Sequence, residues 1–144
     1  MPPSREAFMR AAAALAAEVW DFNREWGFGS FSPRPIPPVF EERHPMRREE
    51  EREMEDAIAA GNMEEAVLEA ADLLWVVLGD LETFGEAGYG AVDAVARKNA
   101  AKTIHTHSIA PSGKLLPLDD AHRHKWAGME EARARARERR GYYA

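Results

Sequence analysis

The stretch from Ala66 to Gly79, AVLEAADLLWVVLG, constrains this chain more than any other segment. Its side chains are apolar or absent except at Glu69 and Asp72, so it predicts a helix that is buried nearly all round. The two acids are three residues apart and therefore share one face of that helix. A carboxylate in apolar surroundings is costly unless it is protonated, paired or bound to a cation. Two carboxylates on one face therefore predict a cation site.

The composition narrows the class of protein. The 144 residues predict a single domain, 1–144, with a helical core at about 4–103 and a loop and C-terminal helix at 104–144. No run of about 20 apolar residues is present, so we expect no membrane partner. The absence of cysteine excludes disulfides and thiolate metal sites and agrees with a cytoplasmic location. The net charge of −6 argues against nucleic-acid binding but not against a nucleotide substrate.

Hydrophobic periodicity predicts four helices. Their expected bounds are Ser4 to Glu25, Glu41 or Pro45 to Ala60, Met63 to Phe84, and Ala91 to about Thr103. The first carries one apolar stripe, formed by Phe8, Ala12, Leu15, Val19, Phe22 and Trp26. The proline-rich segment at 31–40, FSPRPIPPVF, is predicted to be an extended connection rather than a helix.

After the fourth predicted helix, the chain loses its apolar helical periodicity. The segment THSIAPSGKLLP reads as a loop with a short hairpin around Ser112 and Gly113. The tail from Leu118 to Arg140 has high helix propensity and mixed charge. The predicted fold class is all-α, a four-helix bundle with a C-terminal helical extension.

The second and third predicted helices place two acidic clusters side by side. Gly61 and Asn62 end one helix and begin the next, which predicts an antiparallel hairpin. Glu53 lies eight residues before Gly61 and Glu69 eight after it. At a rise of about 1.5 Å per residue, both side chains lie roughly 12 Å from the turn. Glu49 and Glu50 extend the first cluster and Asp72 the second.

Four or five carboxylates at one level form an oxygen cage of the type that holds Mg²⁺, with Mn²⁺ as a substitute. A di-iron bundle would need Glu-x-x-His pairs, and none occurs. Two simpler interpretations remain open. The glutamate run on the second helix is typical of a solvated face, and Glu69 with Asp72 could instead pair with an arginine, the candidates being Arg47, Arg48 and Arg97.

The acidic pattern resembles the signature of the MazG-like all-α nucleoside triphosphate pyrophosphohydrolases. The resemblance rests on EE-x-x-E at 49–53 and E-x-x-D at 69–72, and it extends over roughly residues 15–117. Further similar segments are VWDFNREWGFGSFSPRP, DAIAAGN, ADLLWVVLG, AVARKNAAK and SGKLLP. The last of these is similar to the glycine-lysine turn of members related to phosphoribosyl-ATP pyrophosphohydrolase and dimeric dUTPase.

The resemblance implies Mg²⁺-dependent hydrolysis of a nucleoside triphosphate to the monophosphate and pyrophosphate. It implies metal ligands at Glu50, Glu53, Glu69 and Asp72. It makes Glu49 a further ligand or the group that orients the attacking water, with Glu49 or Glu50 assisting deprotonation. It implies phosphate or sugar contacts at Asn99, Lys102 and Lys114. The family works as homodimers or homotetramers, so an oligomer is expected.

The chain departs from the family pattern at two positions. Glu51 follows the EE pair where the family often has an aliphatic residue, and Asn23 stands where it often has histidine. Asn23 and Trp26 are candidate base contacts, and Arg47 is a candidate phosphate contact or a surface charge. We expect house-cleaning of a nucleotide pool, with dUTP or dCTP as the leading substrates. The alternatives are phosphoribosyl-ATP hydrolysis and a catalytically silent helical oligomer that binds partners through its acidic face.

Overall fold

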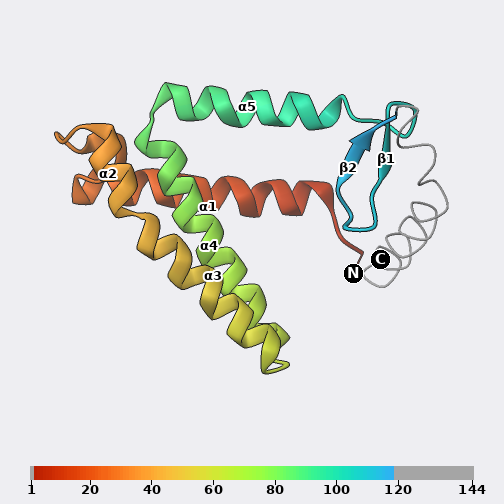
Figure 1. Ribbon diagram of the computed structural model, residues 1–144. Coiled ribbons are helices and arrows are strands. Elements are labelled where there is room, and N and C mark those ends of the chain that lie inside the picture. Colours follow the sequence, from red (N-terminus) through yellow and green to blue (C-terminus); the bar gives the residue numbers. More distant parts are fainter. Residues whose placement is uncertain (1, 119–144) are drawn as a thin grey trace. The chain divides into compact units, whose positions relative to one another are not determined.

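The computed structural model describes residues 2–118 and is mostly helical (Figure 1). The described residues form two compact units, Glu6–Asp93 and a second that combines residues 2–5 with residues 94–118, and each is described by itself. The elements are α1 (Arg5–Trp26), the 3-10 helix η1 (Gly29–Phe31), α2 (Ile36–Glu42), α3 (His44–Ala59), α4 (Met63–Thr83), α5 (Glu86–Ala100), β1 (His107–Ile109) and β2 (Leu115–Pro117). The predicted all-α class is confirmed for the described residues. The four-helix bundle arrangement and the oligomer stay predictions.

The proline-rich segment differs from the extended connection expected for it. Its second half forms α2, which begins at Ile36 and has Pro37 at its second position. Proline is compatible with the first turn of a helix because the N–H groups there have no intrahelical acceptor. The prediction that this segment cannot be helical was therefore wrong, since it treated all its prolines as interior residues.

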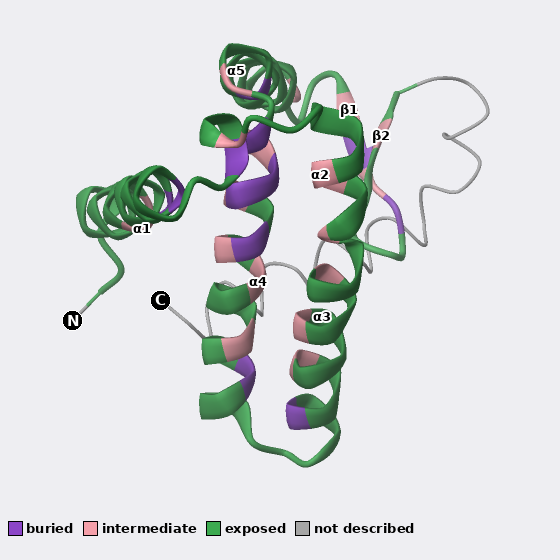
Figure 2. Cartoon of the chain, turned by 90° about the vertical axis from the view of Figure 1, so that its left-hand side faces the viewer, coloured by how far each residue is buried: buried purple, intermediate pink, exposed green. Residues whose placement is uncertain are grey.

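Helices α3 and α4 form the antiparallel hairpin that the sequence predicts, and they pack side by side along their length (Figures 1 and 2). Gly61 makes the turn at φ +73°. The side chain of Asn62 caps α4 by accepting a hydrogen bond of 3.1 Å from the backbone N–H of Glu65. The cap and the turn fix the register of the two helices, and η1 and α2 pack against α4.

Burial along α4 is uneven, contrary to the prediction of a helix covered nearly all round. Figure 2 shows its buried residues gathered mainly in the C-terminal half. Val67 is 69 % exposed and Leu68 58 % exposed, whereas Val76 is 3 % exposed. The difference arises because α4 is covered on one side by α3 and toward its C-terminal end by η1 and α2. The apolar stripe of α1 is likewise open, with Phe8 77 % exposed.

The last described elements partly match the prediction. Helix α5 begins at Glu86, earlier than the expected Ala91. Strands β1 and β2 pair antiparallel, with Ser108 opposite Leu116, and Gly113 occupies the turn at φ +87°, so the expected short hairpin is confirmed. The predicted C-terminal helix lies outside the described residues. Among the helices that the structure describes, none is long and apolar enough to cross a membrane.

Candidate metal and substrate site

Three carboxylates from the α3–α4 hairpin lie close enough to share one ion. Glu50 comes from α3, and Glu69 and Asp72 come from successive turns of one face of α4. One oxygen from each of the three lies within 4.8 Å of the other two. Glu50 and Glu69 are half-buried and Asp72 is exposed, so the cluster opens to solvent on the Asp72 side. The arrangement is an oxygen-only donor set at the surface of the hairpin.

Two oxygens of this cluster have no hydrogen-bond donor. Glu50 Oε2 and Glu69 Oε2 are both buried and unpartnered within the described part of the chain. A buried carboxylate oxygen without a donor is destabilising, and a cation bound there would remove that cost. Oxygen ligands suit a hard divalent ion such as Mg²⁺. The residues present therefore fit such an ion.

The acidic groups raise one another's pKa. Burial raises the pKa of Glu69 to about 7, and the neighbouring carboxyl groups of Glu65, Glu53 and Glu50 act in the same direction. Burial also raises the pKa of Glu50, with repulsion from Glu53 and Asp72 adding to it. Like charges held at close range without a compensating cation have this effect. The packing of α3 against α4 therefore brings several carboxyl groups close together at this point of the hairpin.

The other predicted acids lie nearby but outside the group of three. Glu53 is exposed, yet it is close enough to contribute to the raised pKa of both Glu50 and Glu69. Glu49 is also exposed and acts on Glu50 in the same direction. Their roles as ligand and water-orienting group stay predictions.

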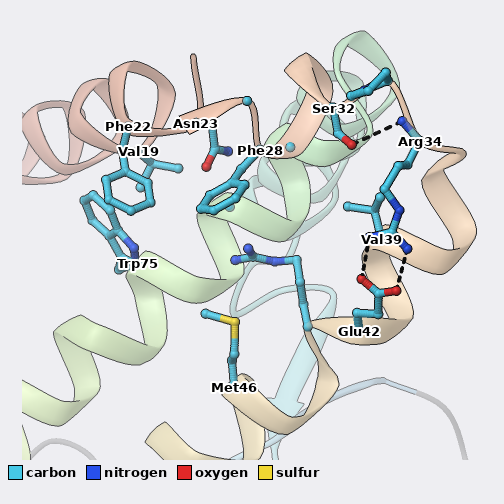
Figure 3. A pocket seen from close by; sticks show the side chains of 15 residues that line it. Val19, Phe22, Asn23, Phe28, Ser32, Arg34, Val39, Glu42, Met46 and Trp75 are labelled. Atoms are coloured by element: carbon cyan, nitrogen blue, oxygen red, sulfur yellow. Dashed lines mark hydrogen bonds and ion pairs between the residues drawn. The ribbon is translucent and has the colours of Figure 1, made fainter. Parts of the chain in front are cut away.

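A cavity of about 540 Å³, whose lining side chains Figure 3 shows, lies one helical turn from the acidic cluster. Trp75 on α4 is one turn beyond Asp72, and Met46 on α3 is one turn before Glu50, and both line the cavity. Its other lining side chains are Val19, Phe22 and Asn23 from α1, Phe28, Ser32, Pro33 and Arg34 from the loop around η1, and Val39, Glu42 and Arg43 from the α2–α3 region. The walls are mainly apolar and aromatic, as in cavities that bind planar organic ligands.

Aromatic rings shape one side of this cavity. The rings of Phe22 and Trp75 meet edge to face with centroids 5.5 Å apart. Trp26, a predicted base contact, is 62 % exposed and stacks on Phe28 at 6.4 Å instead of lining the cavity. Phe28 and Trp75 line the cavity together with Phe22, and the base contact of Trp26 stays a prediction. Trp75 lies within the apolar run at 66–79, whose pattern predicts a buried helix but does not indicate a cavity.

Asn23 is buried at 3 % exposure and contacts a carboxylate that the sequence analysis did not single out. Its side-chain Nδ2 donates to Glu82 Oε1 at 3.1 Å, and the backbone N–H of Ser30 donates to the same oxygen at 3.1 Å. Glu82, itself 5 % exposed, thus joins α1, η1 and α4. In the sequence, Glu82 is distinguished only as an acidic residue that follows the apolar run on the same helix.

Arg47, a predicted phosphate contact, forms an ion pair. Asp80 is buried between two arginines: Arg47 Nη1 donates to its Oδ2 at 2.8 Å, and Arg43 Nε donates to its Oδ1. Arg43 also donates to the carbonyl of Val76 at 2.9 Å. The alternative in which Arg47 pairs with Glu69 or Asp72 is therefore not the arrangement found. Asp80 directly follows Gly79, and its distance in sequence from Arg43 and Arg47 gave no indication that they would form ion pairs.

The three remaining predicted substrate contacts belong to the second compact unit. Asn99 lies at the end of α5, Lys102 follows this helix and is half-buried, and Lys114 precedes β2 and is exposed. The backbone carbonyl of Lys114 accepts a hydrogen bond of 2.7 Å from Ala110 across the hairpin. Their contact with substrate stays a prediction.

Comparison with known proteins finds a family match in the part of the chain that contains the acidic hairpin. The model of the phosphoribosyl-ATP pyrophosphohydrolase family matches residues 32–99, a segment that contains α2, α3, α4 and most of α5. No curated protein and no solved structure matches the chain. The matched family consists of hydrolases that act on pyrophosphate bonds, typically with a metal ion. The matched family lies in the MazG-like all-α nucleoside triphosphate pyrophosphohydrolase superfamily, and residues 32–99 are the part of the chain that is similar to it.

Proposed function

We propose that this protein is a Mg²⁺-dependent nucleoside triphosphate pyrophosphohydrolase that converts a (d)NTP and water to the (d)NMP and pyrophosphate. The observation that carries the proposal is the cluster of Glu50, Glu69 and Asp72, two of whose buried oxygens lack donors. When bound, Mg²⁺ would supply positive charge to the phosphates and polarise a water molecule. Glu53 is a further proposed ligand because its charge already acts on the cluster.

The protein side chains have distinct proposed roles. Water attacks the α-phosphorus, the bond from that phosphorus to the bridging oxygen breaks, and pyrophosphate leaves. Glu49 or Glu50 accepts the proton of the attacking water, since a carboxylate within reach of that water serves as general base. Asn99, Lys102 and Lys114 stay proposed contacts to the triphosphate or sugar.

The aromatic cavity is the proposed nucleoside site. It lies one helical turn from the acidic cluster along both α3 and α4, so a ligand that spans the two would place an apolar ring system beside its phosphates. Phe22, Phe28 and Trp75 offer stacking surface, and Asn23 offers a buried polar group. dCTP and dUTP are the leading substrates.

Phosphoribosyl-ATP is a second candidate substrate, and the family match favours it about equally. Both candidates require hydrolysis of a phosphoanhydride beside a purine or pyrimidine nucleoside. A substrate panel separates them because only one carries a second ribose phosphate.

We also propose a homodimer or homotetramer. The apolar stripe of α1 and the N-terminal half of α4 are open in the single chain, with Phe8 77 % and Val67 69 % exposed. Apolar surfaces of this kind are often covered by a second subunit.

The deciding experiment measures pyrophosphate release from the common dNTPs, NTPs and phosphoribosyl-ATP with Mg²⁺. Activity is expected on one class and should be lost in Asp72→Asn combined with Glu53→Gln. Glu55→Gln, an exposed acid on α3, is the matched control and should retain activity. Full activity in the double variant would refute the site. No release from any substrate, together with no Mg²⁺ binding, would favour a catalytically silent oligomer.

A further inference from the structure

The buried amide of Asn23 has a fixed orientation in the cavity wall. An amide can present either its nitrogen or its oxygen to a neighbour, and the hydrogen-bond network decides between them. Glu82 Oε1 already accepts the backbone N–H of Ser30 at 3.1 Å, so this oxygen is an acceptor whatever the protonation state of the other one. The Asn23 atom that lies 3.1 Å away must therefore be the donor, Nδ2.

The close approach of these groups depends on Gly29. A Cβ atom there would collide with Glu82 Oε1 and Asn23 Nδ2. Gly29 also has φ +57°, a conformation that glycine adopts readily. The absence of a side chain at this position allows η1, α1 and α4 to meet at Glu82.

With its nitrogen held by Glu82, Asn23 has its Oδ1 free for another partner. Among the hydrogen bonds of residues 2–118, none reaches this oxygen. Asn23 lines the cavity, and in Figure 3 its amide lies above the Phe28 ring, with the oxygen on the side of Phe22 and Trp75 and the nitrogen on the opposite side. A hydrogen-bond acceptor among apolar side chains favours a ligand that carries an N–H group.

We propose that Asn23 selects nucleotides whose base carries an exocyclic amino group, and that Glu82 is the positioning residue that turns the Asn23 oxygen into the cavity. This inference rests on the proposed function, because it takes the cavity as the nucleoside site. Cytosine and adenine present amino N–H donors on this edge. At the ring position of that amino group, their keto counterparts, uracil and hypoxanthine, carry a carbonyl oxygen that would face the oxygen of Asn23 without a proton between them, and their nearest donor is the N–H of the neighbouring ring atom. The proposed specificity is thus for amino over keto bases.

The test compares matched ligands in the full-length protein. The probes are the α,β-imido analogues of dCTP and dUTP, and of dATP and dITP, whose altered bridge resists cleavage. Calorimetric titration with Mg²⁺ should give affinities about 10- to 100-fold higher for the amino member of at least one pair. Equal affinities within both pairs would overturn the inference.

Variants of the two residues separate specificity from folding. Asn23→Leu removes the acceptor at similar size and should bring the amino-to-keto ratio close to one, and Asn23→Ser provides the same test with a side chain too short to reach. Glu82→Gln keeps an acceptor oxygen for Ser30 and Asn23 and should preserve the ratio. Glu82→Leu removes that acceptor, frees the amide to rotate, and should lower the ratio. A purely structural role would weaken both ligands equally, and an unchanged ratio in Asn23→Leu and Asn23→Ser would refute the proposal.

Hydrolysis measured in parallel distinguishes this inference from the reaction on which it rests. If dCTP and dUTP are cleaved with equal kcat/KM, the reaction stands and the amino specificity is wrong. If the imido analogues bind with the expected preference and no triphosphate is cleaved, the specificity stands and the proposed reaction is wrong.

Discussion

Glu50 on α3 and Glu69 on α4 face each other across the hairpin, and each buries one carboxylate oxygen that meets no donor. The pair concentrates negative charge where residues 2–118 supply no hydrogen-bond donor to those two atoms. This relationship links the stability of the metal-free protein to pH and to divalent ions, and both links can be measured.

The metal-free protein should lose stability as pH rises through the titration of Glu69. Its pKa in the folded protein is about 7, above the ordinary value of 4.5, so the folded state holds the proton more tightly than the unfolded state. The stabilising contribution is therefore complete below about pH 4.5 and lost as pH approaches and passes 7. We expect the difference in unfolding midpoint between the wild type and Glu69→Gln to change across this window, with EDTA present. Parallel pH profiles for the two proteins would contradict this.

Mg²⁺ should stabilise the protein at pH 8, which lies above the pKa of about 7 of Glu69. A ligand at 100 times its dissociation constant adds about 2.7 kcal/mol to the free energy of unfolding. Glu69→Gln and Asp72→Asn should reduce this gain, whereas Glu55→Gln should keep it. Na⁺ at matched ionic strength controls for screening of surface charge. An equal response to Mg²⁺ in all four proteins would count against a metal site at this cluster.

Asp80→Ala should be strongly destabilising. It leaves the guanidinium groups of Arg43 and Arg47 without their shared carboxylate, in a place where the Asp80 side chain is 8 % exposed. Breaking a buried ion pair from one side costs about 3 kcal/mol or more. Urea unfolding measures this cost. Glu42→Ala, which breaks an exposed pair with Arg34, is the control and should change the midpoint little.

Gly88→Ala and Gly90→Ala should have opposite effects although both lie in α5. A Cβ on Gly88 would collide with the backbone carbonyl of Leu81, whereas one on Gly90 would meet nothing within 4 Å. Alanine in an open helical position is favoured over glycine by about 0.8–1.0 kcal/mol. Thermal unfolding should therefore show a lower midpoint for Gly88→Ala and a higher one for Gly90→Ala. A shift in the same direction for both would disprove the steric argument.

Local patterns predicted the hairpin and its acids because both depend on short spacings. Gly61 and Asn62 mark the turn and the cap, and equal residue counts on either side place Glu53 level with Glu69, so that Glu50, one turn from Glu53, lies near Glu69 as well. The proline-rich segment was misjudged for a local reason too, because proline is tolerated where a helix starts. Fold class and acidic cluster were therefore accessible from the sequence.

Contacts between distant segments were not accessible in this way. Asn23 meets Glu82 over a separation of 59 residues, and Arg43 meets Asp80 over 37. No spacing rule links such positions, because their proximity results from the packing of whole elements. The burial of α4 was overestimated for a related reason. An apolar helix face indicates that another surface packs against it. It does not indicate whether that surface belongs to the same chain or to a second subunit.

The open apolar stripe of α1 has a consequence for how this protein responds to dilution. Few apolar residues of the described part of the chain are buried, namely Val19, Ala57, Ala66, Val76 and Ala110. If association covers Phe8 and its neighbours, folding and assembly obey one mass-action equilibrium. The midpoint of thermal unfolding then rises with protein concentration. A stability measured at a single concentration therefore holds only for that concentration.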